Sequence, residues 1–496
     1  MKSKIEHRRS NIASEASHTA LLHQTRRHFL RTSTSGLGAM WLATTAGRSF
    51  GAAVSGAGAT DRTDHAPKAK RVIFLHMAGA PSQLELFDYK PELVKYDGKR
   101  CPEELIKGER FAFITGVPNM LGPQHPFHQA GNSGAWITDL LPTFERSIDE
   151  VCFIKSMHTD QFNHAPGQLV LTTGTANLGH PSAGAWATYG LGTENHNLPG
   201  FIALVSGGNK PDAGKAAWGS GFLPSLYQGV QCRGKGDPIL YLSNPGGVTQ
   251  PLRRRALDAL NEINRRVHRD VGDPETLTRV AQYELAYRMQ MRASDAFDIT
   301  REKPATLEAY GAAPGEESFA NNCLLARRLA ERGVRFIQLH DWGWDHHGTS
   351  VDKDCRVGIR NKCNEMDRPV GALLEDLRQR GMLEDTLVVW AGEFGRTPMK
   401  ENRAGNQNKG AGRDHHKDAF TIWMAGGGVK PGFSFGETDP IGYKVVRDPV
   451  SLHDLHATIL HLLGFDPKRL TYEFQGLNQR LTNVTKPSRV VKEVIA

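Results

Sequence analysis

The stretch that decides the fold is Val72-Ile73-Phe74-Leu75-His76-Met77, a compact apolar run that ends at Gly79 and Pro81. Such a run, closed by turn residues, predicts a buried central strand followed by a loop. Similar runs follow at 151–154, 201–205, 334–339, 386–390 and 420–424, with helical patterns between them at 167–172, 253–271, 274–297, 318–331 and 351–380. Strands that alternate with helices predict an α/β fold with a mostly parallel central sheet and helices on both faces.

The N-terminal segment differs from the rest of the chain. Arg26-Arg27 precede Phe29-Leu30 and the apolar run 37–46, and a small-residue stretch follows at 51–58. This pattern predicts a twin-arginine export signal, which makes residues 1–60 a signal peptide with a linker and places the protein in the periplasm or outside the cell. That route carries folded proteins, often with a metal in place. Residues 61–496 are expected to form one α/β domain.

Composition excludes several classes of protein. The formal charge is +8, but residues 1–60 hold eight Lys and Arg against two Glu and so supply six of these charges. The small remaining surplus does not indicate a nucleic-acid or anionic-membrane partner. No stretch approaches the ~20 apolar residues of a transmembrane helix. Six cysteines without a C-x-x-C pair predict buried thiols, with room for one long-range disulfide.

Polar side chains suited to metal binding gather beside three of the predicted strands. His340-Asp341 and Asp345-His346-His347 follow one strand, Glu393 and Arg396 follow another, and Asp414-His415-His416 precede a third. In parallel sheets, sites form at the carboxyl ends of the strands. Imidazoles mixed with carboxylates favour a cation such as Zn²⁺, Mn²⁺ or Fe over Ca²⁺ or Mg²⁺. The sequence therefore predicts a divalent metal site, with Zn or Mn as the expected ion.

These motifs resemble a known family. Together with 79–83, 87–91 and 454–464, the stretches 343–348, 393–398 and 412–415 resemble the sulfatase-like proteins catalogued as domain of unknown function 1501, within the alkaline phosphatase superfamily. The resemblance extends over nearly the whole chain after the leader, in the expected order. It implies an alkaline phosphatase/sulfatase-like sheet and an anionic ester or glycan as substrate.

The resemblance also implies a ligand set. Asp345, His347 and His415 match one metal position of the superfamily by order, with His346 and His416 as alternates. The other position is altered, because no aspartate directly follows the first strand and Phe394 stands where relatives carry histidine. His164, Glu393, and Glu85 or Asp88 remain to build a different second site, so one or two ions are expected.

The segment that carries the nucleophile in sulfatases matches residues 164–174 in length and ending. His164 stands where the Ser, Thr or Cys would be, and Gln168 stands where an arginine would be. The N-terminus of the helix expected there would still attract an anionic ester. The covalent mechanism of sulfatases, however, needs a Ser, Thr or Cys nucleophile, which is absent at position 164.

Two functions follow from these residues. The first is an exported metal-dependent hydrolase of sulfate or phosphate esters, in which His164 is a ligand, a base or a nucleophile. Glu393 would then be a ligand or general base, and Arg396 would bind the anionic group bidentately. The second is a non-catalytic binding protein of the cell envelope that keeps the fold.

Structural roles are the alternative for several residues. Glu393 and Arg396 would then form an ion pair within a loop, and Asp88 would hold a turn beside Lys90. Asp454 is expected to cap the helix that follows it, with its nearby histidines on the helix surface or in packing. Trp342 and Trp344 either stack on a sugar or pack under their loop.

Overall fold

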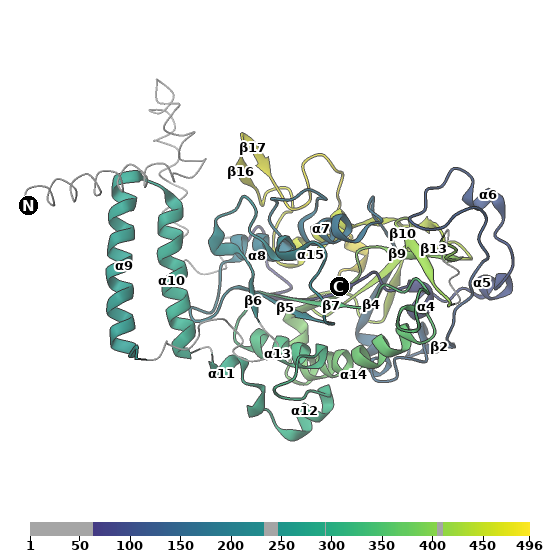
Figure 1. Ribbon diagram of the computed structural model, residues 1–496, viewed down its shortest axis with the longest axis horizontal. Helices are drawn as coiled ribbons and strands as arrows, with labels where there is room; N and C mark the ends of the chain where they lie inside the picture. Colours follow the sequence, from purple (N-terminus) through teal and green to yellow (C-terminus); the bar gives the residue numbers. More distant parts are fainter. Residues whose placement is uncertain (1–62, 233–246, 293, 404–409) are drawn as a thin grey trace, which may run out of the picture. The chain divides into compact units, whose positions relative to one another are not determined.

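A nine-stranded sheet forms the centre of the computed structural model, which describes residues 63–232, 247–292, 294–403 and 410–496 (Figure 1). The strand order is β12-β4-β11-β8-β1-β7-β5-β6, and β15 pairs with β4. All six predicted strands are confirmed as β1 (Arg71–Ala78), β4 (Val151–His158), β5 (Phe201–Ser206), β7 (Phe336–Trp342), β8 (Thr386–Ala391) and β11 (Phe420–Ala425). The other members are β6 (Val230–Cys232), β12 (Phe433–Phe435) and β15 (Val450–Ser451). β11 runs antiparallel to β4 and β8, and the remaining pairs are parallel, so the sheet is mostly parallel as predicted.

The central strand β1 is buried on both faces, which explains why its sequence is apolar throughout. Ile73 and Leu75 belong to one hydrophobic cluster, whereas Val72 and Phe74 belong to the other. Successive side chains of a strand point to opposite faces, so β1 needs apolar residues at every position. His76 breaks this pattern at the carboxyl end of the strand, where it is fully buried.

Helices cover both faces of the sheet (Figure 1). The cluster that contains Val72 includes side chains of α7 (His164–Thr173), α8 (Ala183–Leu191) and α15 (Leu452–Leu462). The cluster that contains Ile73 includes side chains of α12 (Pro304–Tyr310), α13 (Phe319–Glu331) and α14 (Gly358–Gln379). The α/β class is therefore confirmed. Asp454 caps α15 as expected, in a capping box with Ser451.

Smaller elements complete the described chain. The short helices are α4 (Gln83–Leu86), α5 (Pro91–Tyr96), α6 (Glu103–Ile106) and α11 (Ser294–Phe297). Two-stranded ribbons pair β2 (Phe127–Ala130) with β3 (Ala135–Thr138), β9 (Gly395–Lys400) with β10 (Arg413–His416), β13 (Glu437–Thr438) with β14 (Val445–Arg447), and β16 (Tyr472–Phe474) with β17 (Leu477–Gln479). The β9–β10 ribbon carries the predicted site residues Arg396 and His415 and the alternate ligand His416.

The chain divides into two compact units. In the first, the described residues are 247–284, which contain α9 (Gln250–Val271) and the first part of α10 (Pro274–Arg292). The sheet and its covering helices form the second. One α/β domain over 61–496 stays a prediction. The predicted signal peptide, residues 1–60, lies outside the described residues.

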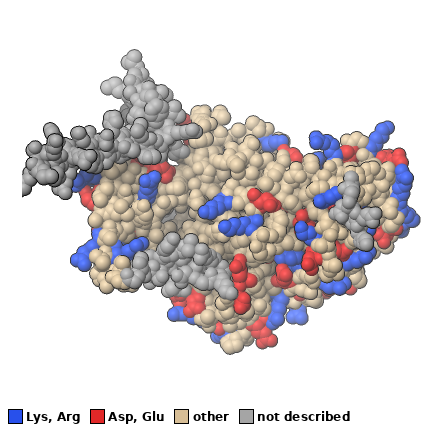
Figure 2. Space-filling view, in the orientation of Figure 1, with Lys and Arg blue, Asp and Glu red and all other residues tan. Residues whose placement is uncertain are grey.

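The surface and the cysteines agree with the composition. On the face drawn in Figure 2, basic and acidic side chains are mixed. No helix in the described part of the chain is long and apolar enough to cross a membrane. All six cysteines are described, and all are buried free thiols, so none forms the disulfide for which the sequence left room.

Candidate metal centre

The site lies where the sheet brings several loops to one edge. β1 pairs in parallel with β7 and β8, so the loops that begin at Gly79, Gly343 and Gly392 leave the sheet side by side. β11 is antiparallel to β8, and the segment that precedes it therefore starts from the same edge. Gly79 has a φ of +109°, and a Cβ there would lie 2.7 Å from the backbone nitrogen of Asp345. This close approach requires glycine.

Four side chains converge at this edge: His164, Asp345, His347 and His415, each offering one possible ligand atom within 4.8 Å of the others. Asp345 Oδ1 lies 2.8 Å from His347 Nε2 and 3.3 Å from His164 Nε2. The distance from the same oxygen to His415 Nε2 is 3.5 Å. The structure thus brings the three residues predicted for the first metal position together with His164, from the start of α7.

Each imidazole of the cluster is held through its other nitrogen. His164 Nδ1 contacts Glu393 Oε1 at 2.7 Å, and His415 Nδ1 contacts the carbonyl oxygen of Phe162 at 2.7 Å. His347 Nδ1 contacts the fully buried carboxylate of Glu401. All three partners are acceptors, so each Nδ1 carries a proton and each Nε2 is turned into the cluster. Burial lowers the pKa of the His164 imidazole, but its hydrogen bonds to Asp345 and Glu393 outweigh burial and raise the pKa to about 9. A metal ion bound there would displace the proton from His164 Nε2. Such outer partners are typical of histidines that bind metal.

The two buried imidazoles of the cluster face each other in a way that favours a cation. The Nε2 atoms of His347 and His415 are 3.1 Å apart. Burial, followed by the charge of Arg396, lowers the pKa of His415 to about 3, so this ring is neutral. His347 Nε2 also lies 2.8 Å from Asp345 Oδ1 and 3.5 Å from Arg396 Nη1. His164 Nε2 is buried and faces the same space, 3.3 Å from Asp345 Oδ1.

The spacing of the donor atoms fits a small divalent ion. Ligands of a tetrahedral Zn²⁺ at ~2.0–2.1 Å from the metal are about 3.3 Å apart along each edge. The four distances given above, 2.8, 3.3, 3.5 and 3.1 Å, fall around that value. Three imidazole nitrogens with one carboxylate oxygen are also a donor set that Zn²⁺, Mn²⁺ and Fe accept. The residues present therefore fit the predicted metal.

Arg396 holds Asp345 in place. Its guanidinium is almost fully buried and donates to the carbonyl oxygens of Gly79, Ala80 and Arg413, and to Asp345 Oδ1. Burial alone would raise the pKa of the Asp345 carboxyl, but Arg396 and the three imidazoles outweigh burial and lower it. These contacts occupy Arg396, so the structure does not present it for the bidentate substrate contact expected from sequence.

Glu393 lies beside the cluster at the centre of a buried hydrogen-bond chain. Its Oε1 accepts from the backbone N–H of Gly79 at 3.0 Å as well as from His164, and its Oε2 lies 3.1 Å from His76 Nε2. His76 Nδ1 in turn lies 2.8 Å from Nδ1 of His340. Glu393 makes no ion pair with Arg396. His76 lies inside an apolar run and carries no signal in the sequence, whereas His340, expected among the metal-binding side chains, is in no cluster of metal-binding groups in the described chain.

The two remaining acids of the prediction lie elsewhere. Glu85 forms a fully buried ion pair with Arg413, with Oε1 2.7 Å from Nη2. Asp88 pairs with Lys90 at 3.1 Å and accepts from the hydroxyl of Thr438 at 2.6 Å. Neither belongs to a cluster of metal-binding groups in the described chain. The turn role considered for Asp88 matches its contact with Lys90.

The alternate histidines are not in the cluster either. His416 Nε2 contacts the carbonyl oxygen of Tyr443, and its ring stacks on the Tyr443 ring. His346 is buried, which lowers its pKa to about 3. A second group, His347 with Glu401 and Asp414, also has close ligand atoms. Asp414, however, accepts three backbone N–H bonds, from Phe113, Ile114 and His415, and is thereby satisfied.

His164 and Asp345 are the members of the cluster most exposed to solvent. The side chains of His164 and Asp345 are 16% and 19% exposed, against 6% for His347 and 3% for His415. Trp342, half-buried, lies edge-on to His164 with ring centroids 5.7 Å apart. Trp344 is fully buried and donates to Asp341, so it packs under the loop. Only Trp342 remains available for stacking on a substrate.

The described part of the Gly/Pro-rich stretch 207–247 contacts residues beside the site. The backbone N–H of Ala213 donates to Gln168 Oε1 at 3.0 Å, and Gln168 Nε2 donates to Glu393 at 3.3 Å. Asp212, beside it, has a pKa raised by burial, against the effect of His164. The rest of the stretch, residues 233–246, lies outside the described residues.

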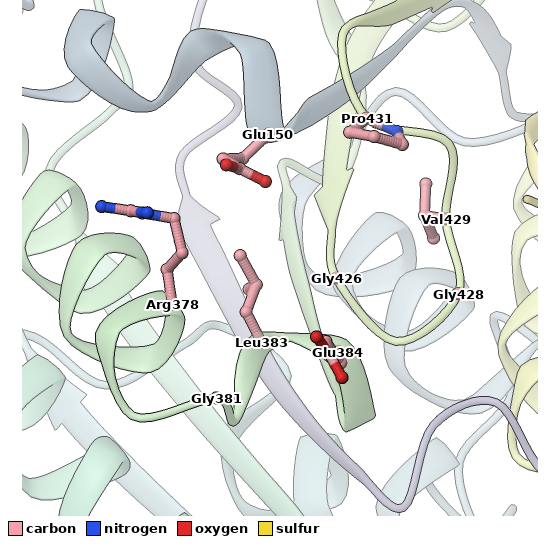
Figure 3. A pocket seen from close by; sticks show the side chains of 9 residues that line it. All are labelled: Glu150, Arg378, Gly381, Leu383, Glu384, Gly426, Gly428, Val429 and Pro431. Carbon is pink, nitrogen blue, oxygen red and sulfur yellow. The ribbon is translucent and has the colours of Figure 1, made fainter.

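A cavity of about 360 Å³ lies at the opposite edge of the sheet (Figure 3). It sits where β4 and β8 begin and β11 ends, and it contains none of the predicted site residues. Its lining is Glu150, Arg378, Gly381, Leu383, Glu384, Gly426, Gly428, Val429 and Pro431.

Comparison with known proteins places the chain in a family. A search of curated proteins found no match. Similar solved structures include the PsFucS1 sulfatase from Pseudoalteromonas sp., at 14% identity and a TM-score of 0.34, covering 84% of this chain and 72% of that one. The lipoteichoic acid synthase LtaP from Listeria monocytogenes is similar at 11% identity and a TM-score of 0.34, covering 86% of this chain and 80% of that one. The phosphonate monoester hydrolase of Agrobacterium radiobacter is similar at 12% identity and a TM-score of 0.32, covering 80% of this chain and 74% of that one. The family described as protein of unknown function (DUF1501) matches residues 69–495. The chain therefore belongs to the DUF1501 family.

Proposed function

We propose that the protein is a metal-dependent hydrolase of sulfate or phosphate esters that works without a Ser, Thr or Cys nucleophile. The observation that carries this proposal is the convergence of three Nε2 atoms and one carboxylate oxygen, with every Nδ1 tied to an acceptor. A divalent cation bound there supplies a Lewis acid for an ester oxygen and lowers the pKa of water. His164, Asp345, His347 and His415 would hold the ion.

We expect the cluster to bind one ion, because the other carboxylates near it already have hydrogen-bond partners. Glu401 holds His347, and Asp414 is satisfied by backbone N–H groups. Both oxygens of Glu393 are engaged, by Gly79 and His164 on one side and His76 on the other. None of the three is free to hold a second ion. Glu393 is then a positioning residue that fixes the His164 tautomer, and Arg396 positions Asp345.

The open side of the cluster defines where a substrate binds. His164 and Asp345 are its most exposed members, so an ester would approach past them and past Trp342. The N-cap of α7, Asn163, makes no capping hydrogen bond with its side chain. The first-turn N–H groups and the positive end of this helix therefore favour an anionic group beside His164.

Metal analysis combined with a substrate panel tests the proposal. We expect one divalent ion per chain and, in the loaded protein, turnover of at least one aryl sulfate, phosphate monoester or phosphodiester. Chelation and His415→Ala should each remove both metal and turnover. His180→Ala, a half-buried histidine outside the cluster, is the matched control and should keep both. Protein that binds no stoichiometric metal would refute the hydrolase.

A non-catalytic binding protein of the cell envelope is the second candidate. It is favoured by the imidazole at position 164, where the nucleophile of the resembling sulfatases would be. In that case the ion would be bound as tightly but no ester would be hydrolysed. The same panel separates the two functions, because metal without turnover on any ester class supports only the binding protein.

Export by the twin-arginine route is part of the proposal. It rests on Arg26-Arg27 and the apolar run 37–46. Replacement of both arginines by lysine should keep the protein in the cytoplasm, whereas Arg8→Lys with Arg9→Lys should not. Cell fractionation distinguishes these outcomes, and equal export of both variants would contradict the signal.

A further inference from the structure

The helical hairpin carries an aliphatic stripe that faces away from its own packing partner. On α9, the side chains of Leu252, Leu260, Ile263 and Val267 are 46%, 39%, 59% and 43% exposed. At 3.6 residues per turn, these four positions fall within about 80° of one another around the helix. Exposed apolar residues that occur singly are ordinary, but a continuous stripe along a helix marks a surface that binds something.

The two helices of the hairpin are held together by contacts that do not involve the stripe. Arg254 of α9 pairs with Glu284 of α10, with Nη2 and Oε1 2.7 Å apart. Asn261, 1% exposed, donates to the same carboxylate. These residues and Leu257, also buried, lie about 130° around α9 from the centre of the stripe. The stripe is thus separate from the face by which α9 packs on α10.

Arginines border the stripe on both sides. By the same helical geometry, Arg253 lies next to one edge, and Arg255 and Arg266 lie next to the other. No ion pair with a described residue engages these three side chains. The acids on α9 are Asp258, which pairs with Arg254, Glu262, which pairs with Arg269, and Asp270, beyond the last residue of the stripe. The local charge is therefore basic, although the chain after the leader is nearly neutral.

We propose that α9 binds an anionic lipid surface, lying in the plane of the headgroups. A predominantly polar helix with aliphatic side chains along one face and arginines along the borders of that face has the composition of interfacial helices. Arginine stems bury along the apolar boundary while their guanidinium groups meet lipid phosphates. Two copies packed stripe to stripe would instead place arginine beside arginine, which disfavours a second copy as the occupant.

Vesicle cosedimentation of the full chain tests this surface. We expect binding to vesicles of phosphatidylcholine with phosphatidylglycerol and little binding to phosphatidylcholine alone. Ile263→Asp with Val267→Asp should lower the binding at least tenfold. Leu178→Asp with Val446→Asp is the matched control, because it adds the same two negative charges at exposed aliphatic residues outside α9. This variant should bind like the parent. The N-terminal leader is common to all variants.

The arginines give the second arm of the experiment. Each basic residue near an anionic surface contributes about a fivefold gain in binding, so Arg253→Gln with Arg266→Gln should weaken binding ~25-fold and reduce its salt dependence. Equal binding by the parent and the Ile263/Val267 variant, or equal binding to neutral and anionic vesicles, would overturn the proposal. So would a parent dimer that this variant dissociates, since the stripe would then bind a second copy.

Discussion

Two buried groups of charged side chains, both built on the β9–β10 ribbon, differ in how their polar atoms are satisfied. In the pair of Glu85 and Arg413, the guanidinium donates twice to Glu85 Oε1 and also to the carbonyl oxygens of Leu121, Gly122 and Thr397. Glu85 Oε2 accepts from the backbone of Gln124. Every group of this pair has its own partner.

The metal cluster lacks this one-to-one pairing. Asp345 Oδ1 is shared by Arg396 and three imidazoles, and the Nε2 atoms of His347 and His415 face each other at 3.1 Å. A group that is complete by itself stabilises the fold, whereas several donors that share one carboxylate oxygen are able to hold a cation. The pairing of polar atoms thus distinguishes the scaffold pair from the candidate site.

The largest expected effect is on the scaffold pair. Glu85→Gln leaves Arg413 charged and without its carboxylate in a fully buried position, so we expect the free energy of unfolding to fall by ~3–5 kcal/mol. Glu92→Gln, which breaks the exposed pair with Lys95, is the control and should cost less than about 0.5 kcal/mol. Urea unfolding measures both. A loss for Glu85→Gln as small as that of the control would contradict the assignment.

Removal of a cluster ligand should act mainly on metal binding. His347→Ala should weaken metal binding at least ~100-fold, more than the loss of an outer partner causes. In the presence of a chelator the variant should also be less stable than the parent, because the buried Glu401 carboxylate loses its contact with His347 Nδ1. Competition with a chromogenic chelator gives the affinity. Unchanged affinity would exclude His347 as a ligand.

Glu401 tests the boundary between the two groups. In the proposed site Glu401 does not bind the ion but accepts a hydrogen bond from Nδ1 of His347. Glu401→Gln should therefore lower the metal affinity ~10–100-fold without changing the number of ions bound. Glu145→Gln is the matched control, since Glu145 holds a surface histidine, His128, in the same manner. Loss of the whole ion in Glu401→Gln would instead make Glu401 a ligand.

The smallest effect concerns a buried histidine of the scaffold. Burial, against a hydrogen bond to the carbonyl of Leu171, lowers the pKa of His456 to about 4. The unfolded chain takes up this proton at about pH 6.5, so stability is retained above that pH and lost as the pH falls toward 4. Between about pH 6.5 and 5 the loss is ~1–2 kcal/mol. In chelator, His456→Gln should unfold with a shallower dependence on pH over this range, and an unchanged slope would show that His456 does not contribute.

The sequence identified most members of the candidate cluster but not the residues that hold them in place. Strand-end position sufficed for Asp345, His347 and Glu393, because a parallel sheet brings those loops to one edge. Glu401 gave no signal, since an acid in a polar loop after a strand is ordinary until its burial is known. His76 lies inside an apolar run, which predicts only a strand. His340 was expected with the metal-binding side chains but contacts His76 instead. Glu85 and Asp88 were proposed from proximity to the first strand, which does not reveal that Arg413 and Lys90 hold them.

Local pattern determined the α/β class, the order of strands and helices, and the residue types able to hold a metal. These follow from hydrophobic periodicity and turn chemistry, which act over a few residues. Tertiary structure alone decided which nitrogen of each imidazole is free, that Arg396 is enclosed by carbonyl groups, and that the stripe on α9 points outward. Those properties depend on partners far apart in the chain, as Glu401 is from His347. No pattern within a short window can specify them.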